Sequence, residues 1–231
     1  MRKSCGLVIA SLRDTKEKTE ELDELGFRSS HRSHFIPHDD AKDIQRWEGF
    51  LEFTIGKSWP SYRGTLTASS PHLSELLTEG VPVSLRPQLY ALIGNIYTQI
   101  DESPKKYLDI YEESVKNGPD KSIEKDLLRT LPDNHYFTHL EDEGILRLRR
   151  ILNAIRFYLP EYGYCQGMGM LTGYLLLILP EEHVFWLLVH LIKVQFCDFH
   201  FRLTFNLHAI GIDKSFPTTW LLRPSQYGYG V

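Results

Sequence analysis

The segment Ile123-Glu-Lys-Asp-Leu-Leu-Arg129 lies at the centre of what this chain offers chemically. Ile123, Asp126 and Arg129 recur at steps of three residues, so in a helix they lie along one slowly turning side. Ser122 is available to cap the first helical turn, and Pro132 is expected to stop the helix soon after Arg129. The pattern therefore predicts an arginine presented close to the end of a short helix.

A second segment, Gly163-Tyr-Cys-Gln-Gly167, follows the next predicted helix, which Pro160 closes. Its two glycines predict a tight turn, because glycine adopts backbone conformations that other residues avoid. The turn would present Tyr164 and Gln166 just before an apolar run begins at Met168. An arginine and a glutamine are thus expected at neighbouring helix junctions.

Helical periodicity runs through most of the sequence. Apolar residues recur at spacings of three and four, whereas no internal repeat, heptad run or long strand-like alternation is present. The predicted fold class is therefore all-α. Besides the helix before Arg129, helices are expected over residues 43–53, 72–79, 85–100, 104–116, 145–159, 168–179 and 184–194.

Composition and charge favour a soluble protein of the cytoplasm. The chain has 231 residues, 42% hydrophobic and 24% charged, which suffices for one good core. Its net charge of −4 gives no overall attraction to nucleic acid or to anionic lipid. The apolar runs at 168–179 and 184–194 are separated by polar residues, and neither reaches the ~20 residues of a membrane span. Three scattered cysteines lack metal-ligand spacing and indicate reduced thiols.

At the two segments the sequence resembles the TBC domain family, the Rab GTPase-activating proteins. The catalytic pattern of that family pairs an Ile-x-x-Asp-x-x-Arg element with a Tyr-x-Gln element, and both are complete here, at 123–129 and 164–166. Upstream, Gly80-Val-Pro-Val-Ser-Leu-Arg-Pro-Gln-Leu-Tyr90 is similar to the first family motif, with Tyr90 where the family usually has Trp. The likeness covers roughly residues 47–193, and within the family it is greatest to the small G protein signalling modulators.

The resemblance implies a GTPase-activating protein of membrane trafficking that acts on a Rab-type GTPase in its GTP form. Arg129 and Gln166 would both enter the site of the GTPase, and Gln166 would take the place of the GTPase's own glutamine. GTP and Mg²⁺ would belong to the partner, so this chain is expected to need no cofactor. Recruitment to membranes would be peripheral, through the partner. The implied site residues are Arg129 and Gln166 as catalytic residues, with Asp126, Tyr164, Ile123 and Arg86 in support.

The N-terminal part differs from the rest in its density of charge. Residues 11–45 are rich in charged and polar side chains without apolar periodicity, so a poorly ordered extension is expected. His31, His34 and His38 lie there, but no cysteine accompanies them, and their spacing suits a flexible loop better than a metal site. The expected domains are an N-terminal extension over 1–79, with a docking helix near 43–53, and a TBC domain over 80–231, family-like to about 193 and divergent over 194–231.

The end of the chain carries a further expectation. The second helical lobe of the family is expected to be missing, as in a truncated product, a splice form or a gene-model fragment. Apolar side chains within 175–179 and 185–192 would then have no later helices to cover them. Part of the core is therefore expected to be exposed and the protein to be marginally stable.

Other interpretations stay open beside the catalytic one. An arginine three residues after an aspartate is usually a surface ion pair, and a Gly-Tyr-x-Gln-Gly turn is often only a helix junction. A non-catalytic Rab-binding scaffold or an inactive truncated form would keep the same surface, and a structural helical adaptor would leave the pairing of Arg129 with Gln166 unexplained. A stand-alone GTPase or kinase is disfavoured, because the chain has no Gly-x-x-x-x-Gly-Lys-Ser/Thr loop. The order of the motifs, with an amphipathic helix between them, favours the catalytic interpretation.

Overall fold

The computed structural model describes residues 22, 25–28, 40–66 and 71–195. Within these ranges the fold is all-α, as predicted, with isolated bridges in place of any strand. Short 3-10 turns lie at Trp59–Ser61 (η2), Leu127–Arg129 (η3) and His135–Phe137 (η4). The helices are α2 (Ala41–Thr54), α3 (Pro71–Glu79), α4 (Arg86–Ile93), α5 (Ile96–Glu102), α6 (Tyr107–Val115), α7 (Lys121–Asp126), α8 (Glu143–Tyr158), α9 (Met168–Leu176) and α10 (Glu181–Gln195).

Some predictions fall on other parts of the chain. Most of the predicted poorly ordered extension, and the loop with His31, His34 and His38, lie outside the described residues. The same holds for the predicted tail from residue 196 onward. Residues 25–28 of the extension are described and contact the domain, where the Gly26 carbonyl accepts from the His135 amide at 2.9 Å. None of the helices in the described part has the length and apolar character that a membrane crossing requires.

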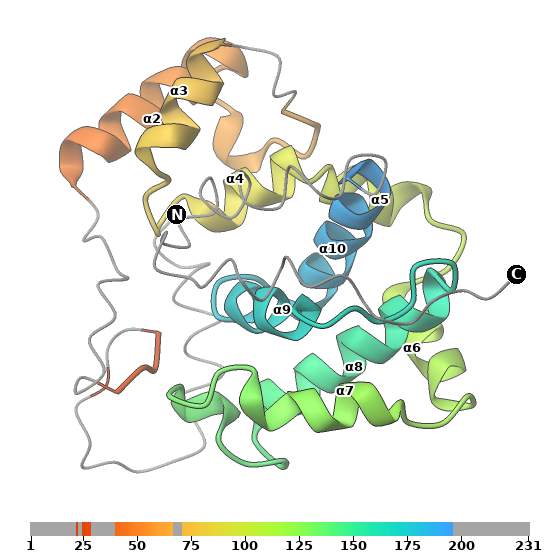
Figure 1. Cartoon of the computed structure of the whole chain (residues 1–231). Coiled ribbons are helices and arrows are strands. Elements are labelled where there is room, and N and C mark those ends of the chain that lie inside the picture. The colour runs from red at the N-terminus through yellow and green to blue at the C-terminus, as the bar shows by residue number, and fades with distance from the viewer. Residues whose placement is uncertain (1–21, 23–24, 29–39, 67–70, 196–231) are drawn as a thin grey trace, which may run out of the picture.

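Helix α8 is the centre of the fold and packs against α6, α9 and α10 (Figure 1). The sequence explains this position, because its apolar residues recur at helical spacing and form one continuous stripe. Helix α8 also contacts α7 and η3, so the helix that separates the two site segments in sequence joins them in space. Five residues of the stripe are at most 1% exposed: Ile145, Leu148, Ile151, Leu152 and Ile155.

A polar group ties three of these helices together. The carboxylate of Glu181, at the start of α10, accepts a hydrogen bond from the Tyr107 hydroxyl of α6 at 2.5 Å. Arg150 of α8 donates to both oxygens of the same carboxylate, at 2.8 and 2.7 Å. We call Tyr107, Glu181 and Arg150 the α10 group. Because each of the three side chains comes from a different helix, the group fixes how α6, α8 and α10 meet.

The predicted docking helix near 43–53 is present as α2. Asp40 caps it by accepting from the Lys42 amide at 2.9 Å, and the predicted face is buried, with Trp47 1% and Leu51 0% exposed. Trp47 Nε1 donates to the Gly80 carbonyl at 2.9 Å. Gly80, in the left-handed region at φ 121°, follows the end of α3, as predicted. Figure 1 shows α2 and α3 side by side at one end of the molecule.

The single helix predicted over 85–100 is wrong, because the chain forms α4 and α5 with a break between them. Asn95 takes the left-handed conformation, at φ 51°. Gly94 lies against α10, where an added Cβ would come within 2.4 Å of Leu187 Cδ1. The break between α4 and α5 therefore lies where α10 packs. Gln99 Nε2 of α5 donates to the Gly94 carbonyl at the break, at 2.9 Å, and to the Trp186 carbonyl of α10, at 3.1 Å.

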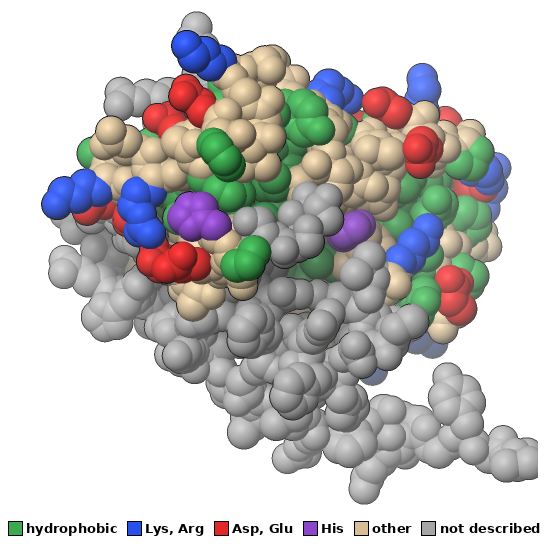
Figure 2. Space-filling view, turned by 90° about the horizontal axis from the view of Figure 1, so that it is seen from above, with side chains coloured by type: hydrophobic (Ala, Val, Ile, Leu, Met, Phe, Trp, Pro, Cys, Tyr) green, Lys and Arg blue, Asp and Glu red, His purple; other side chains and the backbone are tan. Residues whose placement is uncertain are grey.

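The predicted exposure of the core is also wrong. Every residue from 175 to 179 is at most 5% exposed, and so is every residue from 184 to 189. The reason is that α9 and α10 pack against each other and against α8, while α10 also packs against α4 and α5. On the face in Figure 2, charged side chains lie mostly at the periphery and hydrophobic ones surface in patches between them. The large hydrophobic residues exposed in the described ranges are Phe53, Tyr62, Leu108, Val115, Leu128 and Leu140.

Candidate functional site

Helix α7 carries the first site segment and begins differently from the prediction. Asp120, and not Ser122, caps it: Asp120 Oδ1 accepts from the amide of Ser122 at 2.7 Å and from that of Ile123 at 3.2 Å. The helix therefore starts at Lys121, so Ser122 is already inside the first turn. The chain then tightens into η3, which ends at Arg129. The prediction that Arg129 lies at a helix end is confirmed.

The carboxylate of Asp126 joins the two site segments. Asp126 Oδ1 accepts a hydrogen bond from Arg129 Nη2, and Oδ2 accepts one from the Tyr164 hydroxyl at 2.8 Å. The side chain of Asp126 is 12% exposed, whereas that of Arg129 is 59% exposed. We call Tyr164, Asp126 and Arg129 the turn group. The group holds the arginine through one terminal nitrogen and leaves most of the side chain exposed.

Tyr164 acts in this group as a neutral hydrogen-bond donor. Burial raises the pKa of Tyr164 well above its ordinary value, and the hydrogen bond to Asp126 raises it further. Near neutral pH the hydroxyl therefore keeps its proton and donates it to the carboxylate. Asp126 in turn has one oxygen for the tyrosine and one for the arginine.

Small residues allow helix α9 to approach the two residues that follow η3. An added Cβ at Gly169 would lie 3.0 Å from Thr130 Oγ1, and one at Gly173 would lie 2.9 Å from Leu131 Cδ1. Thr130 Oγ1 itself donates to the Asp126 carbonyl at 2.8 Å. Gly169, Gly173 and Thr130 were not predicted as site residues, although two glycines four residues apart on one helix signal a close approach of backbone.

The turn before α9 has the tight shape that its glycines predicted. Gly163 and Gly167 are both in the left-handed region, at φ 61° and 100°. Between them, Gln166 is exposed, and its amide makes no hydrogen bond within the described part of the chain. The two candidate catalytic side chains, Arg129 and Gln166, are thus both exposed, and their segments are joined through the partly buried Tyr164–Asp126 contact.

The two other predicted supporting residues lie apart from this hydrogen-bonded group. Ile123 is 0% exposed and packs in the core beneath α7. Arg86 is 6% exposed, and its Nε donates to the Val81 carbonyl at 3.0 Å, within the loop before α4. The structure therefore places Arg86 as a residue that shapes its own loop, and its predicted support of the site stays a prediction.

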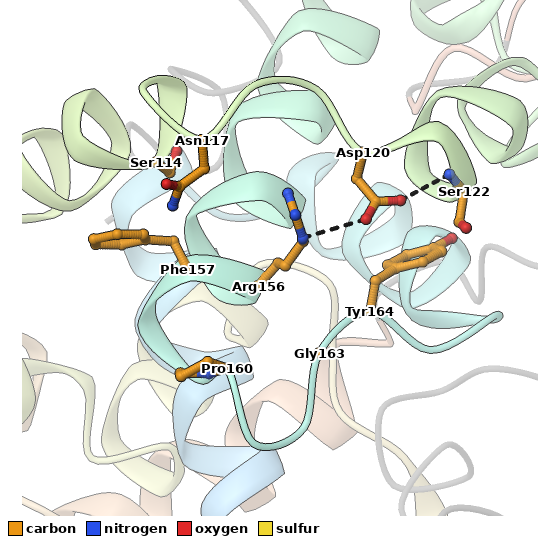
Figure 3. A pocket seen from close by; sticks show the side chains of 9 residues that line it. All are labelled: Ser114, Asn117, Asp120, Ser122, Arg156, Phe157, Pro160, Gly163 and Tyr164. Carbon is orange, nitrogen blue, oxygen red and sulfur yellow. Dashed lines mark hydrogen bonds and ion pairs between the residues drawn. The ribbon is translucent and has the colours of Figure 1, made fainter. Parts of the chain in front are cut away.

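A pocket of about 570 Å³ lies beside the turn group (Figure 3). Its walls come from the end of α6, the start of α7, the end of α8 and the turn that carries Gln166. Within it, Arg156 Nε faces Asp120 Oδ2 at 3.2 Å. The lining residues are Ser114, Asn117, Asp120, Ser122, Arg156, Phe157, Pro160, Gly163 and Tyr164. In the described ranges, no cluster of histidine, cysteine and acidic residues is arranged to hold a metal ion.

Comparisons with known proteins agree on one family. The family model described as the Rab-GTPase-TBC domain matches residues 83–213. The Small G protein signaling modulator 3 homolog of Xenopus laevis is 36% identical, over 77% of this chain and 26% of its own length. Small G protein signaling modulator 3 of Homo sapiens is 34% identical, over 80% and 28%, and TBC1 domain family member 2B of Xenopus tropicalis is 30% identical, over 68% and 16%. The chain spans less than a third of the length of each of these relatives.

The fold is also found among solved structures. The crystal structure of the Chlamydomonas flagellar RabGAP TBC domain matches with a TM-score of 0.51 and 24% sequence identity. The match covers 66% of this chain and 50% of that one. It supports the fold alone.

Proposed function

The chain belongs to the Rab-GTPase-TBC domain family, and we propose that it accelerates GTP hydrolysis by a Rab-type GTPase, to which it supplies Arg129 and Gln166 in trans. The observation that carries the proposal is the double use of Asp126. Its carboxylate bonds to Arg129 on one side and, on the other, to Tyr164, two residues before Gln166. Both proposed catalytic side chains are exposed while the carboxylate that links their segments is buried.

Arg129 has the charge and the free donors for the first role. Negative charge on the phosphoryl oxygens must be stabilised in the transition state, and an arginine supplied in trans can raise the rate on the order of 10³ to 10⁵-fold. Asp126 takes a hydrogen bond from Nη2 alone, so other N–H groups of the planar fork are left for phosphate oxygens. A partner can reach them without opening the core.

Gln166 has the chemistry for the second role. Its amide oxygen can accept a hydrogen bond from the attacking water while its NH₂ group donates, so the water is oriented without any change of charge. The glycines at 163 and 167 hold the turn in a conformation that keeps this side chain at the surface. Asp126 and Tyr164 then act as positioning residues, because they fix the two segments relative to each other.

The remaining roles fall to the partner. GTP and Mg²⁺ are held by the GTPase in this proposal, and this chain adds two side chains but no cofactor. The chain acts on the GTP form, in the cytoplasm, and reaches membranes of the trafficking pathway peripherally through its partner.

Single-turnover GTP hydrolysis by a panel of Rab GTPases, with and without the chain, tests the proposal. We expect acceleration of at least one Rab. For that Rab, Gln166→Ala should lower the accelerated rate on the order of 10²-fold and change binding little, since water orientation matters mainly in the transition state. Gln45→Ala, which removes an exposed glutamine of α2, is the matched control and should keep the full rate.

Two results would contradict the proposal in different ways. A Rab that binds the chain in its GTP form but gains no hydrolysis would identify a non-catalytic scaffold. An equal loss of binding and rate in Gln166→Ala would make Gln166 an interface residue without a role in the chemistry.

A further inference from the structure

The pocket beside the turn group contains hydrogen-bond donors that the described chain leaves unused. Only Nε of Arg156 faces a partner, the Asp120 carboxylate, and the two terminal nitrogens have no hydrogen bond within the described residues. In Figure 3 the Arg156 guanidinium rises between Asn117 and Asp120. The side-chain amide of Asn117 likewise makes no hydrogen bond in the described part of the chain.

The carboxylate of the pocket, in contrast, is already engaged. Asp120 provides the one carboxylate among the described lining residues, and its Oδ1 accepts from the amides of Ser122 and Ile123. Its Oδ2 faces Arg156. The negative charge of Asp120 is thus compensated from both the α7 backbone and α8. The described lining offers no second carboxylate to the terminal nitrogens of Arg156, and a carboxylate fits such a planar pair of donors best.

The pocket lies where a bound GTPase would cover it. Tyr164 and Gly163 belong to the turn that presents Gln166, and Ser122 belongs to the helix that leads to Arg129. We infer that the pocket receives an acidic side chain of the partner GTPase, held by the terminal nitrogens of Arg156 with the Asn117 amide beside them. This inference rests on the proposed function, because the occupant is supplied by the same partner.

Binding of a GTPase tests the inference, and α8 supplies a matched control. The variants are Arg156→Gln and Arg149→Gln, measured by the equilibrium affinity for Rab proteins loaded with a non-hydrolysable GTP analogue. Arg149 also connects α8 to α7, through hydrogen bonds of 2.9 and 3.2 Å to Glu124, but it does not line the pocket. Both variants therefore remove an arginine that ties the same two helices, and only one of them empties the pocket of its cation.

We expect Arg156→Gln to weaken the affinity on the order of tenfold or more, the usual loss for a hydrogen bond to a charged group. Arg149→Gln should change it by about twofold at most. Equal weakening in both variants would show that the Arg156 effect is structural, and an unchanged affinity for Arg156→Gln would show that the pocket is not used. Either result overturns the inference.

A charge reversal identifies the occupant. Replacing the acidic surface residues of the bound Rab by lysine, one at a time, should produce one variant that loses affinity for the natural chain and regains it with Arg156→Glu. A complete scan without such a pair overturns the inference.

The same measurements separate this inference from the proposed function. A chain that binds Rab through Arg156 without accelerating hydrolysis contradicts the proposed function and supports the inference. Acceleration combined with an unchanged affinity in Arg156→Gln contradicts the inference alone. Absence of binding to every Rab of the panel contradicts both.

Discussion

The α10 group and the turn group hold the same three chemical functions, a tyrosine hydroxyl, a carboxylate and an arginine, but they expose the arginine differently. In the α10 group Arg150 is 28% exposed and gives two hydrogen bonds to Glu181. In the turn group Arg129 is 59% exposed, and its hydrogen bond to Asp126 involves Nη2 alone. The guanidinium of Arg150 binds Glu181 through two nitrogens and joins helices, whereas the guanidinium of Arg129 is held through one nitrogen.

The difference comes from where each carboxylate lies. Glu181 begins α10 at the place where α6 and α8 also meet, so side chains from three helices converge on it. Asp126 ends α7 next to a surface turn, so its arginine extends away from the core. The comparison teaches that the α10 group should matter for stability and the turn group for activity.

A lysine in place of either arginine tests this comparison most strongly. In Arg129→Lys the acceleration of GTP hydrolysis should fall about 10³-fold, because an ammonium cannot reproduce the planar fork. Its free energy of unfolding should change by less than ~1 kcal/mol, since Arg129 is largely exposed and lysine keeps the positive charge beside Asp126. Arg150→Lys should retain the acceleration and lose stability instead. Single-turnover hydrolysis and urea unfolding of both variants measure this, and an active Arg129→Lys would remove the distinction between the groups.

Removal of the shared carboxylate from the α10 group should have the next largest effect. Glu181→Ala leaves the buried Tyr107 hydroxyl without its partner and leaves Arg150 with only its longer contact to Glu143 at 3.4 Å, and we expect a loss of roughly 3 kcal/mol in the free energy of unfolding. Glu113→Ala, which breaks the more exposed pair with Lys105, is the control and should cost ~0.5 kcal/mol or less. Similar losses in the two variants would mean that the α10 group is an ordinary surface network.

The two tyrosines allow a finer comparison. Tyr164→Phe removes the hydrogen bond to Asp126, and the acceleration should fall about tenfold because the two site segments are no longer fixed to each other. Tyr107→Phe should instead lower the free energy of unfolding by ~1 to 2 kcal/mol and leave the accelerated rate unchanged. Both readouts on both variants are needed, and the same profile for the two would contradict the comparison.

The smallest expected effect is a pH dependence of stability that arises from two histidines of α10. Burial lowers the pKa of His183 and of His190, so the folded chain keeps both histidines neutral while the unfolded chain takes up protons near its ordinary pKa of ~6.5. The stability they contribute is present above pH ~6.5 and is lost as pH falls through the lower folded pKa values. Urea unfolding between pH 7.5 and about 5 should therefore show a decline that the double variant His183→Gln/His190→Gln reduces. If the double variant showed the same decline in stability with falling pH, titratable groups other than these two histidines would be its cause.

Much of the fold could be predicted from the periodicity of apolar residues. The errors in that prediction come from contacts between helices that are distant in the sequence. The buried stripe of α8 and the docking face of α2 follow directly from the spacing of apolar residues. The break between α4 and α5 does not, because Gly94 meets Leu187, a residue distant in the sequence. The prediction that α9 and α10 are partly exposed was wrong for the same reason. Their apolar faces are covered by each other and by earlier helices.

In the candidate site, too, local features could be predicted from the sequence and contacts between separate segments could not. The motif spacing predicted that Arg129 and Gln166 lie at exposed junctions, because turns and helix ends follow from local sequence. The hydrogen bond between Tyr164 and Asp126 links residues from separate segments, so no local pattern could have predicted it. The cap at Asp120 was within reach of sequence reasoning, but both aspartate and serine are good caps, and the choice between them depends on where the helix begins.

The 3-10 turn between Asp126 and Arg129 also sets an angular phase. In such a turn three residues complete one rotation, so side chains three positions apart point in nearly the same direction, whereas in an α-helix they diverge by about 60°. Arg129 therefore extends on the side of the axis where Asp126 lies. One residue inserted within the turn would swing the guanidinium by about a third of a revolution. The backbone geometry of the turn therefore sets the direction in which Arg129 extends, together with the hydrogen bond from its Nη2 to Asp126.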